Sequence, residues 1–237
     1  MIKNNAKLFL ATTFFQVFGG RGKYKNLKES TALVFPKEIP DQVCKKLLTV
    51  IDDALEASAA NVWWDKVGAD ARILGFETCI PDELFHFNLR SEIEDIERYL
   101  GRKVKSWFLM ANRIRSISGN LGSGGGLHRD SPFSHQVKCI WYLTDVRSEN
   151  GPFQYVPGSH LDAGGKNSRY PAGKYRFEKV NQKLIEVLAP AGSKLVCDTK
   201  CIHSGKPIEL GARYAVTLYT FEKSDGARRF IEKSKRQ

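Results

Sequence analysis

The chain lacks the cysteine patterns that mark a disulfide framework or a zinc knuckle. Its cysteines are odd in number and scattered, at Cys44, Cys79, Cys139, Cys197 and Cys201. This usage is typical of reduced thiols, so we expect a cytoplasmic protein. Cys197 and Cys201 are interpreted as small strand residues rather than as a redox pair.

No long hydrophobic run is present either. The mostly apolar segment 8–18 has eleven residues, whereas a membrane-spanning helix needs about 20. No small-x-small cleavage site follows it, which argues against a signal peptide. Basic residues flank it on both sides, at Lys3, Lys7, Arg21, Lys23, Lys25 and Lys28. We favour an element that packs on the core, and the alternative is an interfacial helix that gives peripheral membrane association.

Internal repeats and low-complexity segments are also absent. A length of 237 residues suits one domain, and 42% hydrophobic residues with 11% aromatics argue against wholesale disorder. The formal net charge is +11, from 37 Lys and Arg against 26 Asp and Glu. The surface should therefore attract anions such as acidic metabolites, phosphates, nucleic acid or anionic lipid headgroups, and the charge alone does not choose among them.

The first part of the chain, residues 1–103, carries helical signals. Apolar residues recur at helical spacing over 41–58, with Asp41 as the expected N-cap, and again over 81–100. His86 lies in the second of these segments and is interpreted as a structural or surface histidine. Each predicted helix has one apolar face, so both should pack on something large.

From residue 104 onward the pattern changes to short runs rich in β-branched and aromatic residues, separated by turns. We expect strands at 104–118, 136–146, 153–156, 183–188, 194–197, 201–202 and 213–221. This predicts a mainly β fold with flanking helices (α+β), a double-stranded β-helix (jelly roll, cupin-like), in a single domain over 1–237. Its core would be 104–222, followed by a basic tail at 223–237. The segment 161–179 has no periodicity and is interpreted as a long exposed loop that carries specificity.

Two residues that follow a glycine-rich stretch carry the strongest chemical signal. In a β-strand, His128 and Asp130 would project to the same side, because side chains alternate. His203 lies in a later strand-like run and would complete a set of two imidazoles and one carboxylate. Such a facial triad is typical of non-haem Fe(II) oxygenases. The alternative is a surface His-Arg-Asp triplet that forms an ion pair.

Arg213 follows His203 by ten residues and begins another strand. It would share one face of that strand with Ala215, Thr217 and Tyr219. A guanidinium that enters a barrel interior needs an anionic partner, and a carboxylate matches it best. These residues therefore predict a dicarboxylate that reaches from the metal to Arg213, and 2-oxoglutarate fits that description.

Together these motifs resemble the phytanoyl-CoA dioxygenase family of Fe(II)/2-oxoglutarate-dependent oxygenases. The resemblance covers roughly residues 104–222 and rests on His128-Arg129-Asp130, Asn150-Gly151-Pro152-Phe153-Gln154-Tyr155-Val156-Pro157-Gly158-Ser159-His160, His203 and Arg213. It implies a double-stranded β-helix in which His128, Asp130 and His203 bind Fe(II). It also implies that Arg213 anchors the co-substrate 2-oxoglutarate and that O₂ is the oxidant. By the same analogy His160 is structural or near the entrance, and His135 is a similar bystander, placed near the substrate.

The expected surroundings of this site are less specific. Asn112 and Tyr142 are candidate donors to the 2-oxoglutarate carboxylate, and both also suit ordinary strand positions. Arg113, Arg115 and Arg129 would supply positive charge around the mouth of the site. The alternative interpretation is that they are solvated arginines on the protein surface. The glycine-rich stretch 119–126 is interpreted as a mobile lip rather than a phosphate loop, since a strand-like segment follows it instead of a helix.

The resemblance predicts a dioxygenase that hydroxylates a C–H bond with release of succinate and CO₂. Asp130 argues against halogenation, because related halogenases carry a small residue there, whereas epimerisation and desaturation stay open. The expected substrate is a small or lipid- or carrier-linked molecule, anionic in character. One alternative is a nucleic-acid demethylase, which we do not favour because such enzymes carry a second arginine where Tyr219 stands. The other is a catalytically silent jelly-roll binding protein.

Overall fold

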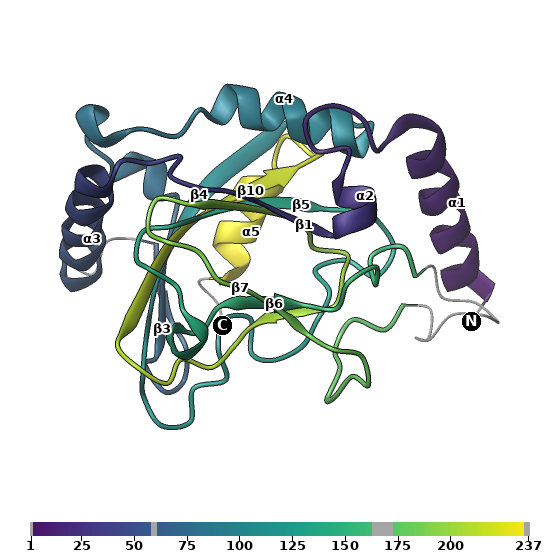
Figure 1. Ribbon diagram of the computed structural model, residues 1–237. Coiled ribbons are helices and arrows are strands. Elements are labelled where there is room, and N and C mark those ends of the chain that lie inside the picture. Colours follow the sequence, from purple (N-terminus) through teal and green to yellow (C-terminus); the bar gives the residue numbers. More distant parts are fainter. Residues whose placement is uncertain (1, 58–60, 163–172, 235–237) are drawn as a thin grey trace.

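Two antiparallel sheets face each other in the computed structural model, which describes residues 2–57, 61–162 and 173–234 (Figure 1). The large sheet has the strand order β1-β8-β5-β10-β4-β3-β2, and the small sheet has the order β7-β6-β9. The strands are β1 (Ala32–Phe35), β2 (Val62–Trp64), β3 (Asp70–Leu74), β4 (Ser106–Arg115), β5 (Val137–Tyr142), β6 (Phe153–Tyr155), β7 (Ile185–Val187), β8 (Lys194–Asp198), β9 (His203–Gly205) and β10 (Ala212–Phe221). The predicted jelly roll is confirmed.

The large sheet presents two faces of different character, because side chains alternate along each strand. On β10, Val216 and Leu218 point to a hydrophobic core that includes Leu47 and Ile96. Leu47 belongs to α3 (Asp41–Glu56) and Ile96 belongs to α4 (Leu89–Leu100), and these two helices cover that face of the sheet (Figure 1). The other face, which carries Arg213, looks toward the small sheet. The helices therefore stabilise one side and leave the other side free for a site.

The two predicted helices differ in how well their boundaries were placed. Helix α3 begins at Asp41 as expected, but the N-cap is Pro40. The predicted end at Ser58 lies outside the described residues. The second prediction was too long, because its first half contains only a short 3-10 helix (Asp82–Leu84). The α-helix α4 begins at Leu89, where the Asn88 side chain accepts a hydrogen bond from the backbone N–H of Ser91 at 3.3 Å. His86 therefore lies between the two helices and not in either of them.

Strands also occur in the part of the chain that was expected to be helical. β1 pairs with β8, and β2 and β3 form a hairpin that extends the large sheet beyond β4. At the other end, the predicted basic tail contains α5 (Gly226–Ser234). The ring of Phe230 on α5 lies 5.5 Å from that of Phe108 and 5.4 Å from that of Tyr219. The single-domain organisation stays a prediction.

The apolar segment near the N-terminus forms α1 (Ile2–Phe18), which leads through the short α2 (Leu27–Ser30) into β1. One side of α1 packs on the core as predicted: Leu8 and Phe15 are buried, and the Phe15 ring stacks on His135 at 3.6 Å. In the part of the chain that the structure describes, no helix is long and apolar enough to cross a membrane.

Candidate metal centre

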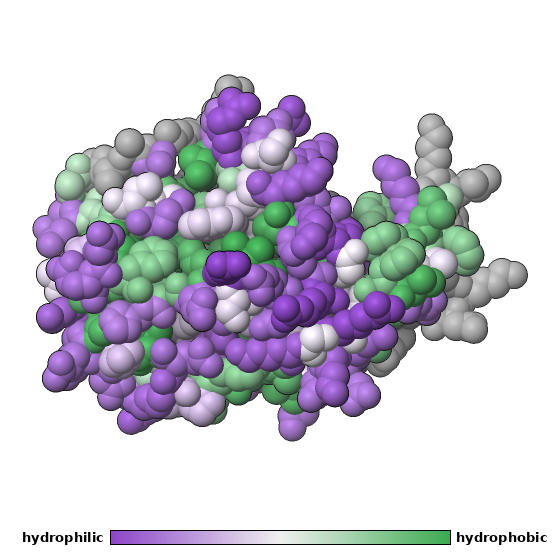
Figure 2. Space-filling view, turned by 90° about the horizontal axis from the view of Figure 1, so that it is seen from above, coloured by the Kyte–Doolittle hydropathy of each residue, from purple (hydrophilic) through white to green (hydrophobic). Residues whose placement is uncertain are grey.

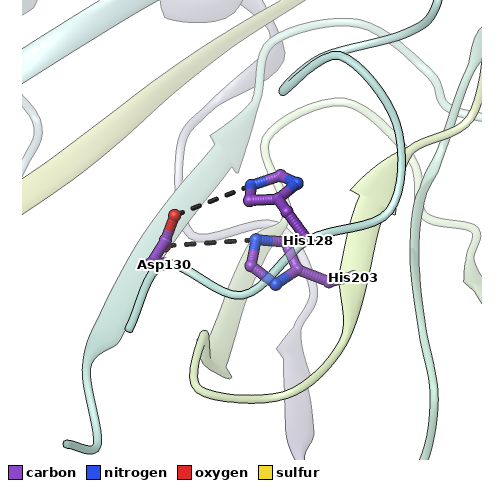
Figure 3. A group of neighbouring side chains, drawn as sticks. All are labelled: His128, Asp130 and His203. Carbon is purple, nitrogen blue, oxygen red and sulfur yellow. Dashed lines mark ion pairs between the residues drawn. The ribbon is translucent and has the colours of Figure 1, made fainter. Parts of the chain in front are cut away.

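Three side chains meet between the two sheets (Figure 3). His128 and His203 lie directly opposite each other, since each backbone N–H donates to the other's carbonyl, at 2.8 and 2.9 Å. The Asp130 carboxylate turns toward both rings. Its Oδ1 lies 3.7 Å from His128 Nε2, and its Oδ2 lies 4.0 Å from His203 Nε2. One ligand atom from each residue falls within 4.8 Å of the others, which is a grouping that could hold a metal ion.

The local backbone differs from the prediction that His128 and Asp130 share a strand. His128 occupies an isolated bridge, paired with His203 and with Arg176, and Asp130 lies in a bend. The Asp130 N–H donates to the Thr199 carbonyl at 3.0 Å, which fixes the bend. The two side chains thus converge because the chain turns between them.

Backbone carbonyls orient both imidazoles. His128 Nδ1 lies 2.9 Å from the Gly126 oxygen, and His203 Nδ1 lies 3.0 Å from the Cys201 oxygen. A carbonyl only accepts, so each Nδ1 carries the proton and each Nε2 offers its lone pair to the centre. Burial lowers the pKa of His203 to about 3, against the opposing charge of Asp130. His203 is therefore a neutral ligand at neutral pH.

A lysine that the sequence analysis did not single out completes the group. Lys138 on β5 places its Nζ 2.7 Å from Asp130 Oδ2 and 4.4 Å from the centroid of the Tyr219 ring. Burial raises the pKa of Asp130, but the charge of Lys138, the hydrogen bond with His128 and the charge of His203 together outweigh burial and hold that pKa well below its usual range. The sequence did contain a signal for this role of Lys138. It is the charged residue of an otherwise apolar strand, and it lies on the same face of that strand as Ile140 and Tyr142.

The triad opens into a cavity of about 870 Å³ lined by residues of both sheets. Strand register brings Asn112 and Tyr142 beside Ala215 on its inner wall. The Tyr142 hydroxyl accepts a hydrogen bond from the Phe153 N–H at 3.0 Å. The structure thus gathers the predicted co-substrate residues, including Arg213, around the same cavity as the triad.

Arg213 is buried in this wall, and burial lowers the pKa of its guanidinium. One Nη donates to the Gly151 carbonyl, whereas the buried Nε has no hydrogen-bond partner among the described residues. A buried cationic donor without a partner calls for an anion. The residues present therefore fit a divalent metal at the triad and a carboxylate at Arg213.

Two of the arginines expected at the mouth lie elsewhere. Arg113 points to the helix-covered face of β4, where it pairs with Asp52 of α3 at 2.5 Å. Arg115 has the same parity on β4 and does not line the cavity. Strand alternation explains both corrections, since these residues are odd-numbered while the inward Asn112 is even-numbered. Arg129 does line the cavity, and it is buried.

Two further histidines, His160 and His135, have structural partners. His160 is fully buried, and its Nδ1 lies 3.1 Å from the Thr31 hydroxyl, as its structural interpretation requires. His135 Nδ1 lies 2.5 Å from Asp198 Oδ2, which also accepts a hydrogen bond from Tyr99 at 2.7 Å. His135 faces α1 and is not among the residues that line the cavity. Its expected position near the substrate was wrong.

The glycine-rich stretch lies beside the triad, as predicted, and lines the cavity. At Gly122 an added Cβ would overlap the Gly205 carbonyl, and at Gly124 it would overlap Cε1 of the His128 ring. Both glycines also have positive φ, at 72° and 86°. The two glycines therefore allow the loop to pack closely against β9 and against the His128 ring. Of the predicted specificity loop 161–179, residues 163–172 lie outside the described residues.

A jelly roll with two histidines and a carboxylate between its sheets is the arrangement of non-haem Fe(II) oxygenases. Residues 34–209 match the model of the family described as phytanoyl-CoA dioxygenase (PhyH), and the chain belongs to that family. The family uses Fe(II), 2-oxoglutarate and O₂, so this is a 2-oxoglutarate-dependent enzyme. No curated protein matches the chain.

Solved structures with low sequence identity share the fold. The α-ketoglutarate-dependent epimerase SnoN from nogalamycin biosynthesis matches with a TM-score of 0.59 at 15% identity, over 87% of this chain and 82% of its own. The carbocyclase SnoK, also from nogalamycin biosynthesis, matches with a TM-score of 0.56 at 16% identity, over 93% of this chain and 90% of its own. HygX from Streptomyces hygroscopicus, with nickel, 2-oxoglutarate and hygromycin B bound, matches with a TM-score of 0.56 at 14% identity, over 81% of this chain and 83% of its own.

Proposed function

We propose that the chain hydroxylates a C–H bond of a small or lipid- or carrier-linked anionic molecule, in a reaction that converts 2-oxoglutarate to succinate and CO₂. The observation that carries the proposal is the triad itself, whose donor atoms lie within 4.8 Å of one another at the edge of a cavity of about 870 Å³. The buried Arg213 on the same cavity wall supports the binding of a dicarboxylate there.

Each residue has a distinct part in this proposal. The Nε2 atoms of His128 and His203 and the carboxylate of Asp130 hold Fe(II), which supplies the O₂ chemistry when bound. Arg213 binds the distal carboxylate of 2-oxoglutarate through its unpartnered Nε. Asn112 donates to the same co-substrate, as does the Tyr142 hydroxyl, whose oxygen already accepts from a backbone N–H and so keeps its proton for another acceptor.

The lining of the cavity supports an anionic substrate with an apolar part. Away from the triad it carries more cations than acids, with Lys66, Arg72, Arg176 and Lys233 against Asp65 and Asp70. Arg72 pairs with Asp70 at 2.5 Å and lies 4.8 Å from the centroid of the Trp63 ring. Trp63 and Tyr175 add aromatic surface. HygX, which binds hygromycin B, sets a precedent for a small-molecule substrate on this fold.

The decisive experiment is succinate formation by the Fe(II)-loaded protein across a panel of acidic sugars, acyl carriers and small acids, with a methylated oligonucleotide included. A product that gains one oxygen atom in mass spectrometry supports hydroxylation. A product that is an isomer of the substrate would show epimerisation instead of hydroxylation. A product that loses two hydrogens would show desaturation or ring closure. Binding of 2-oxoglutarate without any succinate would point to a silent binding protein, and turnover of the oligonucleotide alone to a demethylase.

A further inference from the structure

Helix α1 carries an apolar stripe that faces away from the molecule. Leu10, Phe14, Val17 and Phe18 follow the i, i+4, i+7, i+8 spacing that places residues on one side of a helix. All four are exposed, Leu10 to 67% and Val17 to 53%, and the rings of Phe14 and Phe18 contact each other with centroids 4.9 Å apart. A contiguous apolar stripe of this kind marks an interaction surface.

The body of the protein fixes the direction of this stripe. Phe15, on the opposite side of α1, stacks on His135 at 3.6 Å and meets the Tyr99 ring edge-on at 5.2 Å. After the helix, the Gly20 N–H donates to the Tyr99 carbonyl at 2.6 Å. Helix α1 therefore cannot turn its exposed side inward without losing these contacts. Figure 2, where α1 forms the right-hand end of the molecule, shows apolar residues gathered there with hydrophilic residues around them.

The charged residues of the N-terminal segment all have one sign. Residues 1–28 contain six Lys and Arg and no Asp or Glu. Lys7 is exposed, and Arg21, Lys23 and Lys25 are exposed just beyond the last turn of α1, where the Arg21 guanidinium donates to the Val17 carbonyl at 3.1 Å. Cations beside an apolar stripe complement an anionic lipid surface, in which acyl chains lie below negatively charged headgroups. A second copy of this chain would bring like charges together.

We propose that α1 docks the protein on an anionic membrane surface. Leu10, Phe14, Val17 and Phe18 enter the boundary between headgroups and acyl chains, and the exposed Lys7, Arg21, Lys23 and Lys25 contact the headgroups. This inference goes beyond the proposed function and does not depend on it. It favours substrates that are themselves held at a membrane.

The test is co-sedimentation of the full chain with vesicles made of equal parts phosphatidylglycerol and phosphatidylcholine. We expect binding that is absent with phosphatidylcholine alone and that declines as salt is raised. The double variant Leu10→Glu/Val17→Glu should bind at least about tenfold more weakly. Both positions are exposed, so its thermal unfolding midpoint should match that of the wild type.

The matched control is Leu188→Glu/Leu210→Glu, which makes the same change at two exposed leucines, 54% and 64% exposed, away from α1. It alters the net charge equally and should bind as the wild type does. Equal binding to both vesicle types, unchanged binding of the α1 variant, or equal loss in the control would each overturn the proposal. So would a dimer in sedimentation velocity that the α1 variant dissolves, because a second copy would then be the occupant.

Discussion

Lys138 Nζ and Asp130 Oδ2 lie 2.7 Å apart inside the cavity wall, so the carboxylate of the triad is already paired with a cation. Both side chains are largely buried, at 15% and 18% exposure. Removal of one partner from a buried pair leaves the other charge uncompensated. Loss of Lys138 should therefore destabilise the metal-free protein, and the pair orients Asp130 for a ligand role.

Replacement of Lys138 by Met should destabilise the metal-free protein by about 3–5 kcal/mol, because Asp130 would stay buried without a counter-charge. A divalent cation at the triad would supply that charge. Saturating Mn(II) should therefore raise the thermal unfolding midpoint of Lys138→Met by more than it raises that of the wild type. Lys138→Arg keeps the cation and should behave like the wild type. An equal or smaller rise in the Met variant would show that the pair is unrelated to the metal.

Replacement of Arg213 by Met should weaken 2-oxoglutarate binding. A hydrogen bond to a charged group contributes about 1.5–3 kcal/mol, which corresponds to a roughly 10- to 100-fold rise in Kd. Calorimetric titration of the Mn(II)-loaded protein with 2-oxoglutarate in the absence of O₂ measures this Kd. The affinity for Mn(II) should be unchanged, since Arg213 is not one of the three metal ligands. A parallel loss of both affinities would mean that the variant had disturbed the whole wall.

Gly124 and Gly119 offer a matched pair of substitutions. Both have positive φ, 86° and 82°, so alanine strains the backbone at either position by roughly 1–2 kcal/mol. Only at Gly124 would the new Cβ meet His128, whereas at Gly119 it would make one ordinary contact, with Val67 Cγ1 at 3.7 Å. Gly124→Ala should lower Mn(II) affinity by about tenfold or more, and Gly119→Ala should not. Equal effects would mean that the loop does not position His128.

Asp198 should make a pH-dependent contribution to stability. Burial raises its pKa, but the charge and hydrogen bond of His135, together with the bond from Tyr99, outweigh burial and lower it. Its contribution is thus complete above the unfolded-state pKa of about 3.9 and is lost as the pH falls through the lower folded-state value. Asp198→Asn should cost about 3–5 kcal/mol at pH 7. In urea unfolding, that difference should shrink below about pH 4, and a constant difference would contradict this assignment.

The sequence predicted the parts of the site that local patterns encode. The spacing of His128 and Asp130, the run before His203 and the inward parity of Arg213 are visible in a linear chain, and the fold followed from the turns between short strands. Pairing over long distances was not visible. β1 and the β2–β3 hairpin become strands because β8 and β4 offer free edges to them.

The prediction failed where a contact depends on another element. In the sequence, Lys138 is visible only as a charged residue in an apolar strand. Its pairing with Asp130 depends on how the chain folds and could not be predicted from the sequence. His135 is adjacent in sequence to the triad region, yet its ring turns to Phe15 and Asp198, which lie 120 and 63 positions away along the chain. Arg113 lies one residue from the inward-facing Asn112, and that single step sends it to Asp52 on the helix-covered face.

His128, Asp130 and His203 together should form one iron site that drives 2-oxoglutarate turnover. The most direct test measures Fe(II) binding and succinate formation in the wild type and in His128→Ala, with His86→Ala as a control at a histidine outside the cavity. We expect His128→Ala to lose both iron binding and succinate formation, and His86→Ala to keep both. Unchanged iron binding together with unchanged succinate formation in His128→Ala would show that these residues do not form the iron site.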